Sequence, residues 1–306
     1  MIEVSGLFKR YGDVQALADV TFTVPKGQIV GFLGANGAGK TTTMDILTGC
    51  MGADSGTASI GGVDVTVDPR GAKRQLGYLP DEPPLHNEMR VQEFISYSAR
   101  LHEVPGSEVK RRSDETIDKL SLGEVRNRLV GNLSKGYRQR VGLAQAIVHN
   151  PHVLILDEPT EGLDPNQIVQ IRDLIKSLAG AHTILLSSHI LSEVQNTCDH
   201  IVIIHQGRIV QKGTYDEIVR SVDSSKQFVL RVAENSPALV DRLRSVSGIS
   251  DVRLSAEGNA RIEFGIDGNI EALDAVTRMI VEGGYGLREL SPARKSLEEV
   301  FLKITH

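Results

Sequence analysis

The sequence predicts an α/β fold built on a parallel sheet, followed by a smaller α+β domain. A glycine-rich loop, Gly34–Thr41, lies between a short apolar strand, Gln28–Leu33, and a segment with apolar residues at helical spacing, Thr42–Thr48. From residue 138 to 205, helices alternate with short apolar strands, which is typical of a parallel sheet covered by helices. After residue 228 the expected order becomes strand, helix, strand, strand, helix, strand, as in a compact α+β unit.

The chain is long enough for two domains and has the composition of an ordinary globular protein. Its 306 residues are 40% hydrophobic and 24% charged, with a net charge of −5. This acidity argues against a nucleic-acid partner, and the Lys110–Arg112 cluster is more simply a solvated helix face. Cys50 and Cys198 form no C-x-x-C pair, so we expect neither a disulfide nor a zinc site. Both cysteines are expected to act as small apolar residues of a protein in a reducing compartment.

The first 132 residues fall into two groups of elements. Strands are expected at Ile2–Ser5, Ala18–Val24 and Thr57–Val63, and charged helical segments such as Val91–Leu101 follow. The N-terminus has no basic leader with an apolar run. The longest apolar stretches, such as Val153–Leu156, are far shorter than the roughly 20 residues of a membrane helix. We therefore expect neither a secretion signal nor a membrane span.

The loop at Gly34–Thr41 matches the phosphate-binding pattern G-x-x-x-x-G-K-[ST] in the strand–loop–helix setting that the pattern requires. Its glycines allow backbone N–H groups to converge on phosphate oxygens, and the next helix directs its positive end at the same anion. Lys40 is then placed to neutralise the β- and γ-phosphates, and the Thr41 hydroxyl can ligate Mg²⁺. A turn without a ligand is the alternative, but the complete motif favours a nucleoside triphosphate. The expected nucleotide-binding residues are Gly34, Asn36, Gly37, Ala38, Gly39, Lys40, Thr41 and Thr42.

A second chemical signal is the apolar strand His152–Leu156, which ends in Asp157 and Glu158. A carboxylate pair at the end of a buried strand lies in the crevice where open α/β sheets bind ligands. Asp157 suits the outer shell of the Mg²⁺ that Thr41 touches. Glu158 faces differently and can take a proton from a water aimed at the γ-phosphate. An acidic strand end without a partner is the alternative, which the phosphate loop upstream makes the weaker hypothesis.

The segment Leu133–Arg140 lies between these two sites and runs into a helix at Val141–Val148. Ser134 is expected to cap that helix, and Gly136 allows a backbone N–H to approach an anion closely. Taken alone, such a segment is more often an ordinary helix start. Its position immediately ahead of the two-acid strand favours a second phosphate-binding segment.

Together these motifs resemble those of the ATP-binding subunit of an ATP-binding-cassette (ABC) transporter, over about residues 1–220. The resemblance depends on the order and spacing of the phosphate loop, Leu133–Tyr137, Leu156–Thr160, Gly162–Pro165 and His189. Tyr11 matches the aromatic residue on which adenine stacks in this family, although from the sequence alone it is an ordinary strand-end residue.

The resemblance implies a P-loop NTPase fold with a RecA-like core, an antiparallel β subdomain and a helical subdomain at about residues 88–132. It implies two ATPase subunits, identical or related, that dimerise head-to-tail around two ATP molecules. The phosphate loop of one subunit would face Ser134 and Gly136 of the other. His189 would contact the γ-phosphate, and Asp164 would link the two sites. Such subunits work at the cytoplasmic face of the cell membrane on a separate permease, whose docking surface we expect between residues 81 and 128.

The chain departs from the family pattern in two segments. One is the signature segment, Leu133–Tyr137, and the other is Gly77–Glu82. Lys135 and Tyr137 replace the usual Gly and Gln of the signature, while its phosphate-facing Ser and Gly are kept. Asp81 stands where the family usually has Gln, and sometimes Glu, so Asp81 is expected as the Mg²⁺ ligand with Glu82 as the alternative. This segment normally senses the γ-phosphate, so coupling to the permease is the property that the change puts in question.

The first domain is expected to close with a hairpin at Ile201–Lys212, followed by a linker at 221–227 and a ferredoxin-like domain at 228–306. A docking or dimerisation module is favoured over a ligand-binding sensor, and a last helix is expected at Lys295–Ile304. The tail Leu290–Phe301 resembles the C-terminal extensions of ABC-2-type exporter ATPases, including gliding-motility and drug-export relatives. Expected strands are Phe228–Val232, Asp251–Leu254, Ala260–Phe264 and Gly286–Leu290, and expected helices Pro237–Ser247 and Ile270–Val281.

Two other classes of function stay open at this point. A soluble cassette ATPase acting on ribosomes or DNA is disfavoured, because the sequence has one phosphate loop and no long coiled coil between Thr41 and Leu133. A non-hydrolysing ATP switch is disfavoured by the presence of Glu158 and His189. The transported substrate cannot be inferred, because no residue of this chain is expected to touch it.

Overall fold

The computed structural model describes residues 1–222, 226–233, 237–254, 261–266, 271–292 and 301. The chain divides into two compact units, residues 1–215 and 216–304. Each unit has its own hydrophobic core.

The first unit begins with an antiparallel sheet of order β2-β1-β4-β5. Phe22, Ile2 and Ile60, on three successive strands of this sheet, are at most 1% exposed and belong to the core. The first predicted strand is longer than expected, because its pairing with the next strand continues to Tyr11 opposite Val14. The strands are β1 (Ile2–Tyr11), β2 (Val14–Val24), β4 (Ser55–Ile60) and β5 (Val63–Asp64).

A six-stranded sheet of order β10-β9-β3-β8-β7-β6 forms the centre of the unit. Its neighbouring strands are parallel except for the hairpin of β9 and β10, which turns at Gln206 and Gly207 as the sequence predicts. All residues of β3, β7 and β8 are buried, so both faces of the sheet are covered. The strands are β3 (Ile29–Leu33), β6 (Leu76–Leu79), β7 (Val153–Asp157), β8 (Thr183–Ser188), β9 (His200–His205) and β10 (Arg208–Gly213).

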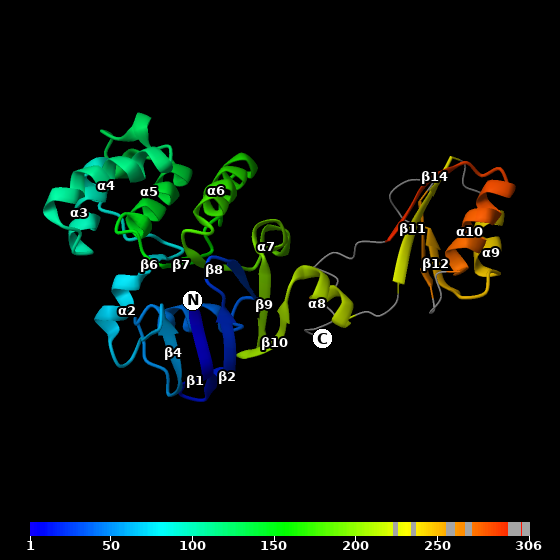
Figure 1. Ribbon diagram of the computed structural model, residues 1–306, viewed down its shortest axis with the longest axis horizontal. Helices are drawn as coiled ribbons and strands as arrows, with labels where there is room; N and C mark the ends of the chain where they lie inside the picture. Colours follow the sequence, from blue (N-terminus) through cyan, green and yellow to red (C-terminus); the bar gives the residue numbers. More distant parts are fainter. Residues whose placement is uncertain (223–225, 234–236, 255–260, 267–270, 293–300, 302–306) are drawn as a thin grey trace. The chain divides into compact units, whose positions relative to one another are not determined.

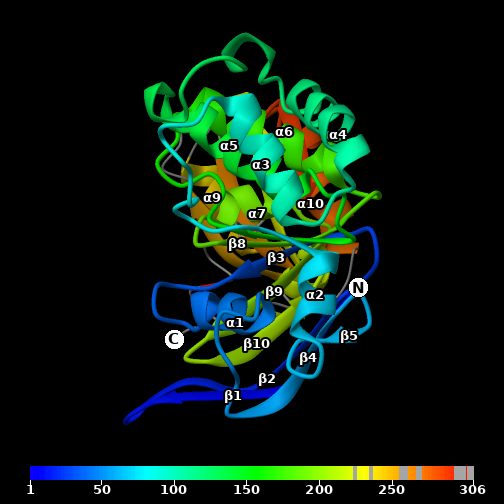
Figure 2. The same cartoon turned by 90° about the vertical axis from the view of Figure 1, so that its left-hand side faces the viewer.

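Helix α1 (Lys40–Leu47) lies between the two sheets, where Met44 and Leu47 join their shared core (Figure 2). On the other side of the six-stranded sheet lie α3, α4, α5 and α6 (Figure 1). These layers confirm the predicted α/β cassette with parallel strands. The helices of this unit are α2 (Pro69–Gln75), α3 (Val91–Leu101), α4 (Gly106–Lys119), α5 (Lys135–Ile147), α6 (Pro165–Leu178) and α7 (Leu191–Thr197), with short 3₁₀ turns at Gly123–Val125 and Val130–Asn132.

The second unit contains an antiparallel sheet of order β12-β13-β11-β14, packed against α9 and α10. Leu239, Phe264 and Val276 are at most 1% exposed and lie in its core. The elements follow the expected order from β11 onward. They are α8 (Tyr215–Val222), β11 (Lys226–Val232), α9 (Pro237–Arg244), β12 (Ile249–Leu254), β13 (Arg261–Ile266), α10 (Glu271–Glu282) and β14 (Leu287–Pro292).

Several predicted boundaries differ from the structure in this second unit. The expected linker at 221–227 is too long, because α8 extends to Val222 and β11 begins at Lys226. Helix α9 ends at Arg244, where the helical hydrogen-bond pattern loosens. The Ser245 N–H is shared between the carbonyls four and three residues back, at 3.2 and 3.1 Å, and the Val246 N–H donates only to the carbonyl three residues back, at 3.2 Å. The predicted hairpin turn at residues 257–259 lies outside the described residues, as does the predicted helix at 295–304 apart from residue 301. Among the described residues, no helix is long and apolar enough to cross a membrane.

Candidate functional site

A cavity of about 550 Å³ lies at the carboxyl ends of the central strands, where open α/β sheets bind ligands. We call it the nucleotide cavity. It brings together most of the predicted phosphate-loop residues and the acids predicted for metal binding and catalysis. The lining residues are Val14, Gln15, Ala16, Ala35, Asn36, Gly37, Gly39, Lys40, Thr41, Thr42, Asp81, Asp157, Glu158, Glu161 and His189.

The phosphate loop is held tightly between β3 and α1. Gly39 has a φ of 112° and forms the N-cap of α1, a left-handed conformation that favours glycine. A Cβ on Gly34 would come within 2.6 Å of the Ile204 carbonyl oxygen, so this position also requires glycine. These constraints direct the N-terminus of α1, and with it a set of free backbone N–H groups, at the cavity.

Lys40 is buried at the mouth of this loop, with 7% of its surface exposed. Its ammonium group donates a hydrogen bond of 2.7 Å to the Gly34 carbonyl oxygen. The same nitrogen lies 3.5 Å from Glu158 Oε1. A cation and a carboxylate from distant parts of the chain therefore meet directly at the predicted phosphate position.

Asp157 ends β7 and is 6% exposed. Burial raises the pKa of its carboxyl group, the hydrogen bond that the Ser187 hydroxyl donates to it lowers the pKa, and the charge of Glu158 raises it. Thr41 and Asp81 line the same cavity, so three oxygen ligands of the kind that Mg²⁺ prefers open into one space. Glu82, the alternative to Asp81, is not among the lining residues.

Glu158 departs from the strand geometry of its neighbour. Its φ of 44° breaks the alternation of side chains, and its N–H donates to the Ser187 hydroxyl at 3.0 Å. One carboxylate oxygen consequently reaches His189, with 2.9 Å to Nδ1 and 3.3 Å to the backbone nitrogen. This arrangement fixes the direction of a carboxylate that the sequence predicts to act as a base.

The predicted signature residues lie elsewhere on the same unit. Ser134 and Gly136 line a separate cavity of about 90 Å³, which we call the signature cavity, and neither lines the nucleotide cavity. Ser134 occupies the N-cap position of α5, but its hydroxyl makes no capping hydrogen bond, so the predicted side-chain cap is wrong. A Cβ on Gly136 would come within 2.8 Å of the Gln167 side-chain amide, so a larger residue there would displace that side chain.

Asp164 and Tyr11 also lie outside the nucleotide cavity of this chain. Asp164 caps α6, because its side chain accepts a hydrogen bond of 3.0 Å from the Gln167 N–H. Tyr11 is 45% exposed at the end of β1, and its hydroxyl donates to Met51 Sδ at 2.8 Å. Its backbone pairs with that of Val14, which does line the cavity.

Sequence reasoning missed three contributions to the site. Ser187 orients both acids and Glu161 joins the cavity lining, yet neither was assigned a role. The wall at residues 14–16 comes from the β1–β2 hairpin, in which only Tyr11 had been assigned a role. A polar residue at the end of an apolar strand was a usable signal for Ser187, whereas no motif marked residues 14–16 themselves.

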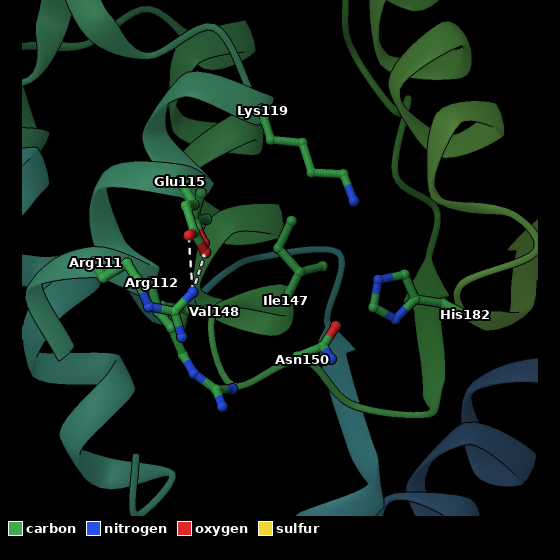
Figure 3. Close-up of a pocket in the computed structure, with 9 residues that line it drawn as sticks. Arg111, Arg112, Glu115, Lys119, Ile147, Val148, Asn150 and His182 are labelled. Carbon is green, nitrogen blue, oxygen red and sulfur yellow. Dashed lines mark hydrogen bonds and ion pairs between the residues drawn. The ribbon is translucent and has the colours of Figure 1, made fainter. Parts of the chain in front are cut away.

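A further cavity, of about 310 Å³, lies at the opposite ends of the parallel strands (Figure 3). We call it the basic cavity; Lys119 and His182 point toward one another across it. Arg111 is already paired with Glu108 and Glu115, at 3.3 and 2.8 Å. None of the predicted nucleotide-binding residues lies there. Its lining is Arg111, Arg112, Glu115, Thr116, Lys119, Ile147, Val148, Asn150 and His182.

Comparison with known proteins identifies the class of protein to which this fold and site belong. Residues 17–161 match the ABC transporter family. The bacitracin transport ATP-binding protein BcrA of Bacillus licheniformis is 32% identical over 99% of this chain and 97% of its own length. The daunorubicin/doxorubicin resistance ATP-binding protein DrrA of Streptomyces peucetius is 35% identical over 99% and 92%.

Solved structures give the same result for the first unit. The structure of an ATP-binding subunit of an ABC transporter aligns with a TM-score of 0.66 and 34% identity, covering 72% of this chain and 92% of that protein. The cassette MJ0796 shares the fold, with a TM-score of 0.64 and 23% identity over 70% and 98% of the two chains. The chain therefore belongs to the ATP-binding subunits of ABC transporters and is an ATPase. A soluble cassette of ribosomes or DNA is not favoured.

Proposed function

We propose that this chain binds ATP with Mg²⁺ in the nucleotide cavity and hydrolyses it to drive a separate membrane permease that exports its substrate. The convergence of Lys40, Glu158 and His189 on one cavity supports this most directly, because a cation, a base and its orienting partner meet beside the phosphate loop. Glu158 would accept the proton of the attacking water, and Lys40 would stabilise charge on the phosphates. His189 would hold Glu158 in place through its Nδ1 hydrogen bond.

The residues around Asp157 fit a bound Mg²⁺. Its carboxylate is buried beside a second acid, and the resulting rise in its pKa is what a nearby divalent cation would offset. The Thr41 hydroxyl and the Asp157 and Asp81 carboxylates would hold the ion, which supplies charge neutralisation for the triphosphate. Asp81 is favoured over Glu82 because only Asp81 lines the cavity.

A second copy of this chain, or a related subunit, would complete the site. Ser134 and Gly136 lie in the signature cavity, away from the phosphate loop of their own chain, so they serve a phosphate only if another subunit presents it. The Ser134 hydroxyl makes no capping bond and so is available to donate to such a ligand. The MJ0796 cassette, which shares this fold, is described as a dimer. Asp164 and Tyr11 would act at this interface and on the adenine, as the family resemblance implies.

The partner of this ATPase is proposed to be a polytopic permease in the cell membrane, with this chain bound to its cytoplasmic face. No described helix can span a bilayer, and the relatives are named as transport and resistance ATP-binding proteins. The surface between residues 81 and 128 is the proposed docking region. Export is favoured over import by the sequence of the tail, Leu290–Phe301.

The second unit is proposed to be a ferredoxin-like docking or dimerisation module at about residues 228–306. The element order β11-α9-β12-β13-α10-β14 and the sheet order β12-β13-β11-β14 support this assignment. A docking or dimerisation role is proposed in preference to a ligand-binding sensor.

Light scattering of the Glu158→Gln variant tests the proposal. With Mg·ATP the variant should form a stable dimer, while its turnover should fall about 10²–10⁴-fold, the range for a general base. The wild-type protein with ADP is the control and should stay monomeric. A Glu158→Gln protein that hydrolyses ATP at the wild-type rate, or stays monomeric at saturating Mg·ATP, would contradict the proposed site.

A further inference from the structure

Helix α7 follows the candidate histidine directly, and one of its side chains reaches back to the acidic segment. Glu193, in the first turn of α7, accepts a hydrogen bond from the Thr160 hydroxyl. Thr160 is 7% exposed and lies two residues after Glu158. This bond therefore joins the segment that carries the base to the helix that begins beside His189.

Thr160 is the centre of a tight turn. The Glu161 N–H donates to the Glu158 carbonyl at 3.1 Å, and the Leu163 N–H donates to the Thr160 carbonyl at 3.3 Å. Asp164 then caps α6. Fixing Thr160 consequently fixes the path of the whole turn, residues 158–164, between the candidate base and the cap of α6.

Besides the neutral Thr160 hydroxyl, several charged groups act on the carboxyl group of Glu193. Burial raises the pKa of its carboxyl group, the Thr160 hydrogen bond lowers it, and the charge of Glu158 raises it further. His189 and Arg172, the latter on the neighbouring helix α6, lower the pKa of Glu193 through their charge. Keeping a partly buried carboxyl beside another acid is costly, so a purely structural role would be served as well by an apolar side chain.

We propose that Glu193 is a positioning residue for ATP hydrolysis. It holds the turn at residues 158–164 against α7, so that Glu158 and His189 keep their relative positions. Glu193 does not line the nucleotide cavity, so it acts through Thr160 and not by direct contact with the substrate. Its contribution is the orientation of the base, a factor to which rates are sensitive even for displacements of about 1 Å. This inference rests on the proposed roles of Glu158 and His189.

Steady-state kinetics of the full-length protein distinguish positioning from packing. Glu193→Ala and Thr160→Val should each lower kcat about 10- to 100-fold, with the KM for ATP and the thermal unfolding midpoint nearly unchanged. The double variant should be no slower than the slower single variant, because both remove the same bond. Glu193→Gln and Thr160→Ser keep an acceptor and a donor, and should restore kcat to within a few-fold of wild type.

The matched control is Gln195→Ala, which truncates an exposed side chain on the same helix and should leave kcat unchanged. Wild-type kcat in Glu193→Ala, a parallel change in KM, or losses that multiply in the double variant would overturn the inference. If Glu193→Ala does not fold, Thr160→Val and its rescue by Thr160→Ser decide the question alone. Glu158→Gln is assayed in parallel: normal turnover there defeats the proposed function, whereas slow turnover beside a normal Glu193→Ala defeats only this inference.

Discussion

The two ends of the six-stranded sheet both carry clusters of charged side chains, but the clusters are built differently. In the nucleotide cavity, Lys40 meets Glu158 and Glu158 meets His189, across 118 and 31 positions of sequence. In the basic cavity, Arg111 pairs with Glu108 and Glu115 of its own helix. Long-range pairs exist only when the tertiary structure is formed, whereas pairs three or four residues apart form on an isolated helix.

This difference separates a site from a charged surface. The Lys40 and Glu158 side chains are 7% and 12% exposed, so water weakens their interactions little. Arg111 and Glu115 are 58% and 60% exposed, where solvent screens most of the attraction. Substitutions at the two ends of the sheet should therefore differ greatly in their effect on ATP binding, turnover and stability. Four experiments test this expectation.

Lys40→Ala should have the largest effect and abolish ATP binding, because it removes the buried cation beside the phosphate loop. Isothermal titration calorimetry with Mg·ATP measures the loss. Lys119→Ala is the matched control, since it deletes a lysine from the basic cavity and should bind ATP normally. Tight binding by Lys40→Ala would show that the phosphate-loop assignment is wrong.

His189→Gln should lower turnover about 10²-fold, the lower end of the range for loss of general base catalysis, because Glu158 loses its orienting partner. The KM for ATP should change much less. Steady-state ATPase assays test this, with His152→Gln as a control at the opposite end of the sheet. Equal losses in the two variants would mean that His189 has no special relation to Glu158.

His149, behind the basic cavity, should make stability depend on pH. Burial, with the charge of His102, lowers the pKa of His149 from 6.5 to about 4, while its ring N–H donates to the Leu76 carbonyl at 3.0 Å. Because the folded-state pKa is depressed, this contribution to stability is present above pH 6.5 and is lost as the pH falls toward 4. The loss between pH 7 and pH 4.5 should be about 2 kcal/mol.

Urea unfolding of wild type and His149→Gln at both pH values measures this contribution. The variant should lose less stability on acidification than wild type does. His205→Gln, on the β9–β10 hairpin, is the control. An identical pH dependence in wild type and His149→Gln would exclude His149 as the group responsible.

Arg111→Ala should have the smallest effect. Its ion pairs lie on the surface of α4, so neither ATP turnover nor the thermal unfolding midpoint should change measurably. Differential scanning fluorimetry and the ATPase assay test both expectations. A clear loss of turnover would give the basic cavity a functional role that its local pairing does not suggest.

Much of the site could be predicted because its residues follow strong local patterns. The phosphate loop, Asp157 and Glu158 all occupy the ends of apolar strands, and a parallel sheet places such ends at one edge. Glu193 was missed for the opposite reason, because its partner Thr160 lies 33 residues away and no spacing in the sequence indicates the contact. Ser187 lies at the end of an apolar strand, which was a usable signal, but its contact with Asp157, 30 residues away, is a product of the fold. The same holds for the pairing that extends β1 to Tyr11, which depends on β2.

The sequence by itself determined the class of this protein, because a phosphate loop, a signature and a two-acid strand are contiguous motifs that can be recognised without knowing which distant residues they contact. It also determined the order of elements in the second unit from β11 onward, since hydrophobic periodicity is a local property. The tertiary structure decided which groups touch: Lys40 with Glu158, Glu158 with His189, and Thr160 with Glu193. It also put Ser134 and Gly136 in a different cavity from the phosphate loop, because α5 begins away from the strand ends that form the nucleotide cavity.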